Sequence, residues 1–410
     1  MAENFQKIAL ARQGQVDPAS IEDFLDSGGF ESLKKALALK PEEIVESIEK
    51  SGLRGRGGAG FSTGLKQKYT AKAYSDNKRK FVVCNADEGE PGTFKDRVIM
   101  ESDPFLLIEG IIISAYAISA DYGYVYLRGE FYQSIENIKN AIELCYKKGY
   151  LGKDILGSGF SFDLEIALGA GSYLCGEELT LLESLEGNRG YPRIKPPFPA
   201  EKGLWGKPTL INNVETFTHI PFIIEKGYEE YANIGTEESK GTKIFCVSGN
   251  VINPGVYELP MGVLLKELIY DVAGGIKDGY SFKGALLGGA AGSFVDRSFL
   301  DVPLAYETLK QKGSTLGSGA VIVIDDKTDM KALLSSVLSF FKHESCGKCV
   351  PCRIGTTLLY DMINNVSVTE KDLLRMQDEA SYMAKSSLCP LGQSPDLPLK
   401  TFVQYFKNSL

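Results

Sequence analysis

Four cysteines near the end of the chain restrict how its C-terminal part can fold. Cys346, Cys349 and Cys352 form a C-x2-C-x2-C run, and Cys389 lies far downstream, directly before a proline. Three closely spaced thiolates can bind one side of an iron–sulfur cubane, and a distant fourth cysteine followed by proline completes a known ligand pattern. We therefore predict that all four hold one 4Fe–4S cluster, which requires the fold to bring the two segments together.

A structural zinc site is the main alternative for these cysteines. Zinc sites more often show two separated C-x2-C pairs, or histidines. The chain has only one such set of cysteines and only two histidines. The spacing favours iron–sulfur ligation over zinc or unrelated thiols. Such a cluster needs an electron donor, which the rest of the chain has to supply.

Length and composition exclude several classes of protein. The 410 residues allow two or three domains. A net charge of −8 argues against binding to nucleic acid. The most apolar stretch, 105–120, is interrupted by Glu109, Gly110 and Ser114, so it predicts a buried helix and no direct membrane insertion. The first residues lack the apolar core of an export signal, and eight cysteines without one favour a cytoplasmic location.

A glycine-rich segment, 52–61, is a candidate phosphate-binding loop. Three of its glycines match G-x-G-x-x-G, but a predicted helix precedes them in place of a strand, so we reject an ordinary Rossmann turn. Glycines let backbone N–H groups approach a phosphate closely, and Arg54, Arg56 and Lys66 add positive charge. A flexible surface loop is the alternative.

Strands and helices alternate from residue 81 onward. Hydrophobic patterns predict strands at 81–85, 124–127 and 162–168, with helices between and after them. This order predicts a parallel or mixed sheet covered by helices, with a ligand site at the carboxyl ends of its strands. Several polar residues follow those ends: Asp87, Glu88, Glu90, Glu130, Tyr173, Glu177 and Glu178. Their carboxylates could accept ribose hydroxyls, or they could form a solvated rim.

The second half of the chain has a different pattern. A hairpin at 243–248 and 256–259, a helix at 264–272 and a strand at 320–325 resemble a β-grasp module. It shows no catalytic constellation, so we interpret it as a scaffold or docking surface. Helices are predicted at 330–343, 356–364, 368–385 and after Pro395, with the cluster cysteines in the connections between them.

Five motifs in a fixed order identify a family. They are Gly52–Lys66, Asn85–Thr93, Ser172–Glu178, Asn212–Thr216 and the four cysteines. Together they resemble the NADH-oxidising flavoprotein subunit of respiratory complex I, a subunit type also found in NAD-linked hydrogenases and formate dehydrogenases. The resemblance implies three domains: an α/β Rossmann-like FMN and NADH domain with a helical N-terminal segment (1–240), a ubiquitin-like α+β β-grasp domain (241–328), and an all-α four-helix domain with the 4Fe–4S cluster (329–410).

The resemblance also implies the site residues. Those expected at the FMN cofactor are Gly55, Arg56, Gly57, Lys66, Asn85, Asp87, Glu88, Tyr173, Gly176, Glu177, Asn212, Asn213 and Thr216, with Glu88 also lining the NADH site. Those expected at NADH are Phe61, Tyr69, Glu90, Glu178, Lys195 and Phe198, the three aromatic rings flanking the adenine. The remaining cysteines are expected to pack in the core: Cys84, Cys145, Cys175 and Cys246.

The implied function is electron transfer from NADH through FMN to the cluster, with no catalytic side chain, because hydride transfer needs no general base. The pair Gly392-Gln393 resembles the hydrogenase relatives and favours the beta subunit of a soluble NAD-linked hydrogenase, with or without electron bifurcation. Complex I and an NAD-dependent formate dehydrogenase are alternatives, and a non-catalytic relay or structural subunit is a further one. Expected partners are a small 2Fe–2S thioredoxin-like subunit and a larger iron–sulfur or catalytic subunit.

Overall fold

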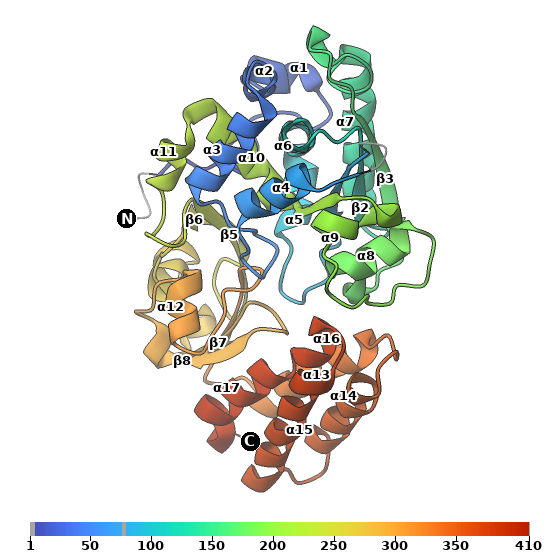
Figure 1. The fold of residues 1–410 in the computed structure, drawn as a ribbon. Helices are drawn as coiled ribbons and strands as arrows, with labels where there is room; N and C mark the ends of the chain where they lie inside the picture. Colours follow the sequence, from blue (N-terminus) through green and yellow to red (C-terminus); the bar gives the residue numbers. More distant parts are fainter. Residues whose placement is uncertain (1–4, 76–78, 410) are drawn as a thin grey trace.

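The structure is a computed structural model that describes residues 5–75 and 79–409. It is a mixed α/β fold with a parallel sheet in the N-terminal part and a helical region at the C-terminal end (Figure 1). The expectation that the chain begins without an export signal concerns in part residues 1–4, which lie outside the described residues.

The first sheet is parallel throughout, in the order β3-β2-β1-β4. Its strands are β1 (Phe81–Ala86), β2 (Tyr122–Arg128), β3 (Asp163–Gly169) and β4 (Thr209–Asn213). The first three confirm the predicted strands. Strand β4 was not predicted, because five residues after a proline-rich segment give no clear alternation of apolar and polar side chains.

Helices cover both faces of this sheet. Val82 and Cys84 of β1 belong to the core that contains the helices α6 and α10, whereas Phe81 and Val83 pack with α8 on the other face. Burial on both faces is typical of parallel strands. The helices of this part are α1 (Ile21–Asp26), α2 (Glu31–Leu37), α3 (Pro41–Ser51), α4 (Thr63–Lys72), α5 (Lys95–Ser102), α6 (Pro104–Ile118), α7 (Tyr132–Lys148), α8 (Glu178–Leu185), α9 (Pro199–Lys202), α10 (Val214–Lys226) and α11 (Tyr228–Ala232).

The second sheet is mixed, in the order β6-β5-β9-β7-β8. Its strands are β5 (Thr242–Gly249), β6 (Gly255–Pro260), β7 (Phe282–Leu287), β8 (Ser293–Asp296) and β9 (Ala320–Asp325), with helix α12 (Tyr306–Gln311). The predicted hairpin is confirmed by the antiparallel pairing of β5 with β6. Strands β7 and β8 were not predicted. The helix expected at 264–272 is present mainly as a π-helical segment, Glu267–Val272.

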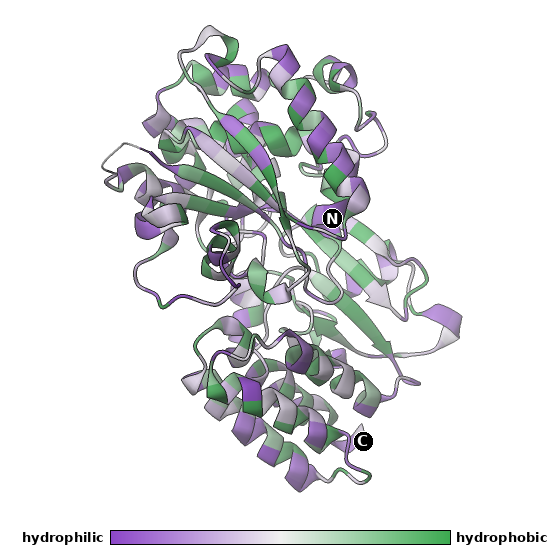
Figure 2. Cartoon of the chain, turned by 90° about the vertical axis from the view of Figure 1, so that its right-hand side faces the viewer, coloured by the Kyte–Doolittle hydropathy of each residue, from purple (hydrophilic) through white to green (hydrophobic). Residues whose placement is uncertain are grey.

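The C-terminal region consists of helices, as predicted: α13 (Met330–Glu344), α14 (Val350–Ile363), α15 (Glu370–Ser386), α16 (Pro390–Gln393) and α17 (Asp396–Phe406). Mixed hydrophilic and hydrophobic residues run along these helices (Figure 2). Thr369 and Asp372 form a capping box at the start of α15. One expectation was wrong: α14 begins at Val350, six residues earlier than predicted, because Pro351 is well placed in a first helical turn. Cys352 is therefore helical and not in a connection.

The helical region packs against the second sheet. Phe294 of β8 contacts Phe402 of α17, with ring centroids 5.3 Å apart. The buried cluster around this contact also includes Leu286 and Ile324 of the sheet. Across residues 5–75 and 79–409, none of the helices is both long and apolar enough to cross a membrane.

Candidate functional site

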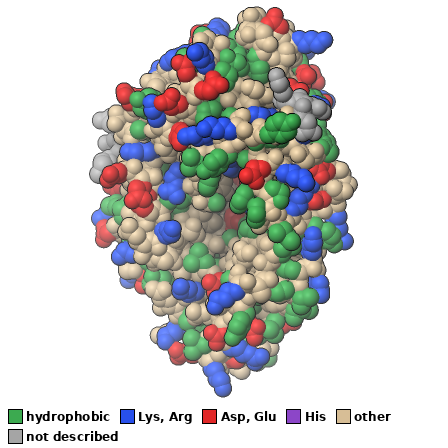
Figure 3. Space-filling view, in the orientation of Figure 1, with side chains coloured by type: hydrophobic (Ala, Val, Ile, Leu, Met, Phe, Trp, Pro, Cys, Tyr) green, Lys and Arg blue, Asp and Glu red, His purple; other side chains and the backbone are tan. Residues whose placement is uncertain are grey.

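A cavity of about 800 Å³ lies at the carboxyl ends of the parallel strands. The surface is hollowed near the middle of the face seen in Figure 3. Of the residues expected at the cofactor and at NADH, the following line it: Gly55, Gly57, Phe61, Lys66, Tyr69, Asn85, Tyr173, Gly176, Glu177, Glu178, Lys195, Phe198, Asn212, Asn213 and Thr216. Its volume is in the range of sites that hold small organic ligands.

The glycine-rich loop forms one wall of this cavity. Gly57 lies so close to Asn213 that a Cβ at position 57 would be 3.0 Å from Asn213 Cβ. The N–H of Arg56 donates to Thr216 Oγ1 at 2.9 Å, which ties the loop to the start of α10. A glycine backbone held in this way leaves room for a ligand close to the main chain.

Asn212 and Asn213 end β4 and have different surroundings. Asn212 is buried, lines the cavity, and its Nδ2 has no hydrogen-bond partner within the described residues. An unpaired buried donor at a cavity wall fits a polar ligand edge, since a buried donor normally finds a partner. Asn213 is fully engaged: its Oδ1 accepts from Lys95 Nζ at 3.0 Å, and its Nδ2 donates to Asp96 Oδ2 at 2.6 Å.

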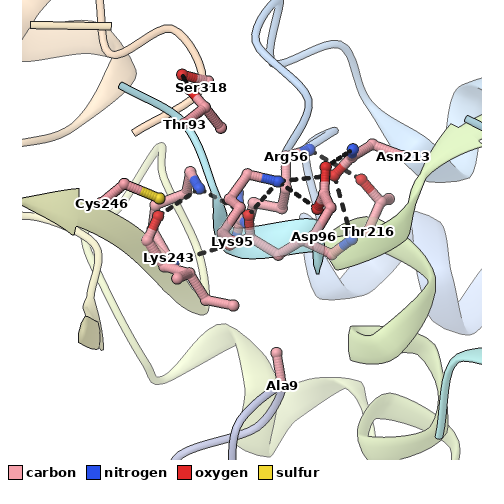
Figure 4. A network of polar contacts seen from close by, with 12 residues as sticks. Ala9, Arg56, Thr93, Lys95, Asp96, Asn213, Thr216, Lys243, Cys246 and Ser318 are labelled. Carbon is pink, nitrogen blue, oxygen red and sulfur yellow. Dashed lines mark hydrogen bonds and ion pairs between the residues drawn. The ribbon is translucent and has the colours of Figure 1, made fainter. Parts of the chain in front are cut away.

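A buried polar network extends behind Asn213 (Figure 4). Lys95 Nζ lies 3.0 Å from Glu215 Oε2, and Lys243 Nζ lies 2.7 Å from the same oxygen. Against the effect of burial, the charges of Lys243 and Lys95 lower the pKa of Glu215 to about 2. The network connects α5, α10 and β5, so it fixes the cavity wall to the second sheet.

Charged side chains lie along another part of the wall. Lys195 Nζ lies 2.9 Å from Glu177 Oε1 and 2.7 Å from Glu178 Oε1. Glu177 also caps α8, accepting from Thr180 N at 2.9 Å. Lys66 Nζ donates to Ile211 O at 2.8 Å, and burial lowers the pKa of this amine. These groups can hold the polar parts of a nucleotide.

Three aromatic rings stand at the mouth of the cavity with about half of their surface exposed: Phe61, Tyr69 and Phe198. Exposed aromatic faces beside a cavity can stack on a planar ring. The nearby Trp205 is outside this lining and packs edge-on against Phe81, with ring centroids 5.4 Å apart.

A second, smaller cavity of about 360 Å³ adjoins the first and shares Asn85, Tyr173 and Gly176 with it. Asp87, Glu88 and Glu90 line only this second cavity. Burial raises the pKa of Asp87 to about 7, and its Oδ2 has no partner among the described residues. Glu90 accepts from Tyr173 Oη at 2.5 Å and from Ala291 N at 2.9 Å.

Four of the expected site residues lie outside the lining of the first cavity: Arg56, Asp87, Glu88 and Glu90. The Arg56 side chain is fully buried on the far side of its loop, where Nη2 donates to Tyr231 Oη at 3.0 Å and to Lys240 O at 2.5 Å. Glu88 caps α5, accepting from the backbone N–H of Asp96 at 2.8 Å. The guanidinium of Arg56 is held by hydroxyl and carbonyl groups from distant segments, and Arg56 lines neither cavity.

The four cysteines lie together at one end of the helical region. Cys349 is the N-cap of α14, Cys352 lies in its first turn, and Cys389 is the N-cap of α16. Gly392 allows their approach, since a Cβ there would be 2.8 Å from Cys352 Cβ. Burial raises the pKa of the Cys352 thiol to about 11. The other three thiols of the motif lie near enough to raise this pKa as well.

No three His, Cys, Asp or Glu side chains in the described ranges are grouped tightly enough to hold a single metal ion. A mononuclear zinc site needs its ligands at about 2.0–2.3 Å from one ion. A cubane takes one thiolate at each of four irons, so its ligands surround a larger group. Four neighbouring thiols, three of them at the N-terminal ends of α14 and α16, fit that donor set.

The cavity and the cysteines are neighbours. Pro390 and Leu391, which directly follow Cys389, line the first cavity. Sequence reasoning missed them because nothing in their pattern points to a ligand. It also missed Gly288, Ala291, Thr315, Gly317 and Ser318, which line the second cavity. The second sheet, which the sequence suggested as a scaffold or docking surface, thus also forms part of a cavity wall; the run Gly288-Gly289-Ala290-Ala291-Gly292 was the available signal of a close approach.

Three family models match the chain. Residues 48–222 match the Nuo51 FMN-binding domain, residues 332–410 the NADH-ubiquinone oxidoreductase-F iron-sulfur binding region, and residues 244–290 the SLBB domain. The first model covers the cavity walls built by the glycine loop and the parallel strands, and the second covers all four motif cysteines.

Similar proteins extend over nearly the whole chain. The F subunit of the NADH-quinone oxidoreductase of Aquifex aeolicus (strain VF5) is 47% identical over 95% of this chain and 90% of its own length. The HndC subunit of the NADP-reducing hydrogenase of Solidesulfovibrio fructosivorans is 44% identical over 98% of this chain and 82% of its own length.

A solved structure shares the fold. A chain of an NAD+-reducing [NiFe]-hydrogenase in the H2-reduced state superposes with a TM-score of 0.84 at 36% sequence identity. The match covers 94% of this chain but only 65% of the hydrogenase chain. Identity over almost the full length of both sequences, together with the FMN and iron–sulfur models, establishes that this chain belongs to the family of NADH-quinone oxidoreductase F subunits.

Proposed function

We propose that this chain is the NADH-oxidising, or NAD-reducing, beta subunit of a soluble NAD-linked hydrogenase complex. As a member of its family it is an NADH-oxidising flavoprotein subunit that carries FMN and a 4Fe–4S cluster, with NADH as substrate. FMN, when bound, supplies the conversion of two-electron hydride chemistry into one-electron transfer. The protein supplies binding, orientation and the short path between the two cofactors.

One observation carries the proposed electron path from NADH through FMN to the cluster: the first cavity is lined both by the ends of the parallel strands and by Pro390 and Leu391, next to the predicted cluster ligand Cys389. A ligand in this cavity lies against the segment that carries a cluster thiolate. Electrons leaving the cavity therefore have a direct route into the helical region.

The roles of individual residues are part of the proposal. The glycine loop, Asn85, Asn212 and Thr216 would hold FMN. Lys195, with Glu177 and Glu178, would position the polar parts of NADH, while the three aromatic rings would flank its adenine. Glu90 would line the nicotinamide end, because it lies in the second cavity beside Tyr173, which both cavities share.

The finer organisation is likewise proposed. The two separate sheets support a boundary near residue 240 and a β-grasp type for the middle domain, and the change from strands to helices after β9 supports a boundary near residue 328 and a four-helix arrangement for the last domain. We further propose a cytoplasmic complex with a small 2Fe–2S thioredoxin-like subunit and a larger iron–sulfur or catalytic subunit.

The electron path is tested by reducing the purified protein with NADH under anaerobic conditions. Bleaching of the flavin should be followed by a low-temperature EPR signal from the cluster, equal to that obtained with dithionite. The Glu90→Gln variant should weaken NADH binding at unchanged FMN content. A flavin that bleaches while the cluster stays oxidised would refute the path, and loss of FMN in the variant would refute the role of Glu90.

The parent complex is tested by anaerobic purification with native partners. A co-eluting hydrogenase subunit would support the proposal, because the Gly392-Gln393 pair was the observation that favoured it. Quinone-module or membrane subunits would make the chain the entry point of complex I instead. A formate dehydrogenase subunit would point to the third alternative.

A further inference from the structure

The second sheet contributes a direct contact to the proposed NADH site. The turn Gly288–Gly292 joins β7 to β8, and its Ala291 N–H donates to Glu90 Oε1 at 2.9 Å. The other carboxylate oxygen, Oε2, accepts from Tyr173 Oη at 2.5 Å. The Glu90 carboxylate is thus held between a residue of the first cavity and the backbone of the second sheet.

Gly289 permits this contact. It has a φ of +90°, and a Cβ at this position would lie 2.3 Å from Glu90 Cγ and 2.5 Å from Glu90 Oε1. No side chain fits in that space while Glu90 stays in place, because real Cβ contacts are longer than 3 Å. The turn is also tight within itself: Gly292 N donates to Gly289 O at 2.9 Å.

The chain that follows Glu90 rests on the same sheet. Thr93 Oγ1 and Ser318 Oγ are 2.5 Å apart, and Phe94 N donates to Cys246 Sγ at 3.3 Å. A Cβ on Gly92 would lie 2.9 Å from a methyl carbon of Ile322. Since the loop is fixed at several points, a displaced Glu90 side chain cannot be accommodated simply by moving the loop outward.

We propose that Gly289 is a positioning residue for NADH: the Gly288–Gly292 turn holds the Glu90 carboxylate beside Tyr173, and a side chain at position 289 removes it from there. This inference rests on the proposed role of Glu90. By this inference the second sheet takes part in substrate binding through its backbone, although it supplies no catalytic group.

The test uses Gly289→Ala in the complete protein with its cofactors. The variant should raise the Kd for NAD+, measured by titration calorimetry, and the KM for NADH by about tenfold, because a hydrogen-bonded carboxylate is lost from the site. FMN content and kcat should change little. The matched control is Gly275→Ala: its φ is +92°, so the backbone strain is similar, but the nearest atom to its Cβ is a Tyr270 carbon at 3.5 Å.

A double-mutant cycle separates this inference from the proposal on which it rests. In a Glu90→Ala background, where the clash is absent, Gly289→Ala should have no further effect on Kd or KM. An equal effect with and without Glu90, an equal effect of Gly275→Ala, or no effect of Gly289→Ala would overturn the inference. Unchanged NADH binding in Glu90→Ala alone would instead overturn the role of Glu90.

If Gly289→Ala fails to fold, the double variant Gly289→Ala/Glu90→Ala still tests the inference. If Glu90 is the only obstacle, the double variant Gly289→Ala/Glu90→Ala must fold with a normal content of FMN. A double variant that still fails to fold would show that the glycine is required for the turn itself and would overturn the positioning role.

Discussion

Lys95 and Glu215 form an ion pair that is closed off from solvent, with 3.0 Å between Nζ and Oε2 and at most 1% of either side chain exposed. Glu215 also receives Lys243 at 2.7 Å and the N–H of Ile244 at 2.8 Å. Lys95 has a second partner in Asp96 at 2.6 Å, and Glu215 is the carboxylate shared by both buried ammonium groups, which come from α5 and β5. It joins the parallel sheet to the second sheet directly behind the proposed cofactor cavity.

Replacing Glu215 by Gln should destabilise the protein strongly. The change leaves Lys243 without its carboxylate, and removal of one partner from a buried ion pair costs about 3–5 kcal/mol. Urea unfolding followed by circular dichroism measures the loss. Glu31→Gln is the control, since the Glu31–Lys34 pair is exposed and should contribute little. Equal stability of the two variants would contradict the buried character of the network.

Glu109 should make stability depend on pH. Glu109 lies in α6, and burial of its carboxyl raises the pKa from 4.5 to about 7, although the hydrogen bond from Ser32 lowers it. The folded chain therefore binds more protons than the unfolded chain between these two values, so this contribution to stability falls as pH rises through them. Relative to wild type, Glu109→Gln should gain about 3 kcal/mol between pH 4.5 and pH 7.

Denaturant titrations at pH 4.5 and pH 7 test this expectation. The exposed substitution Glu136→Gln provides the control and should follow the wild-type protein at both pH values. A constant difference between Glu109→Gln and wild type would mean that Glu109 has the same pKa in the folded chain as in the unfolded chain.

Local signals in the sequence predicted the elements that depend on neighbouring residues. Pro41 at the first turn and Gly52 at the end define α3, and Gly52 has the left-handed φ of +71° that such an end requires. In β3, exposed Asp163 and Glu165 alternate with buried Leu164, and this local alternation was enough to predict a strand. The cysteine spacing predicted which segments the helical region brings together.

Features that depend on distant segments could not be predicted in this way. The direction of the Arg56 side chain is set by Tyr231 and Lys240, more than 170 residues away. The contact between Glu90 and Ala291 spans 201 residues. Neither partner is visible from local propensity, because nothing near Arg56 or Glu90 in the sequence specifies which backbone or ring will face them.

Cys389 should be needed for the cluster but not for the flavin. Cys389→Ala removes a predicted ligand, while the first cavity is lined by its neighbours Pro390 and Leu391 and not by its thiol. Anaerobic preparations should lose bound iron and the EPR signal and keep FMN. Cys145→Ala, in a buried cysteine of α7 outside the motif, should retain both cofactors. Zinc in place of iron in the wild-type protein would favour the alternative metal.

The aromatic rings at the mouth of the cavity should contribute to NADH binding without affecting FMN. Phe198 and Phe61 are half exposed, a position that is costly for a large apolar ring unless a ligand covers it. Phe198→Ala should raise the KM for NADH about three- to tenfold, the equivalent of one stacking contact, with little change in kcat. Tyr132→Ala removes a ring that is 77% exposed and outside both cavities, so its KM should equal that of wild type.

Steady-state kinetics with an artificial electron acceptor gives KM and kcat for each variant, and flavin absorbance gives the FMN content. Equal KM values for Phe198→Ala and Tyr132→Ala would place the adenine away from this rim.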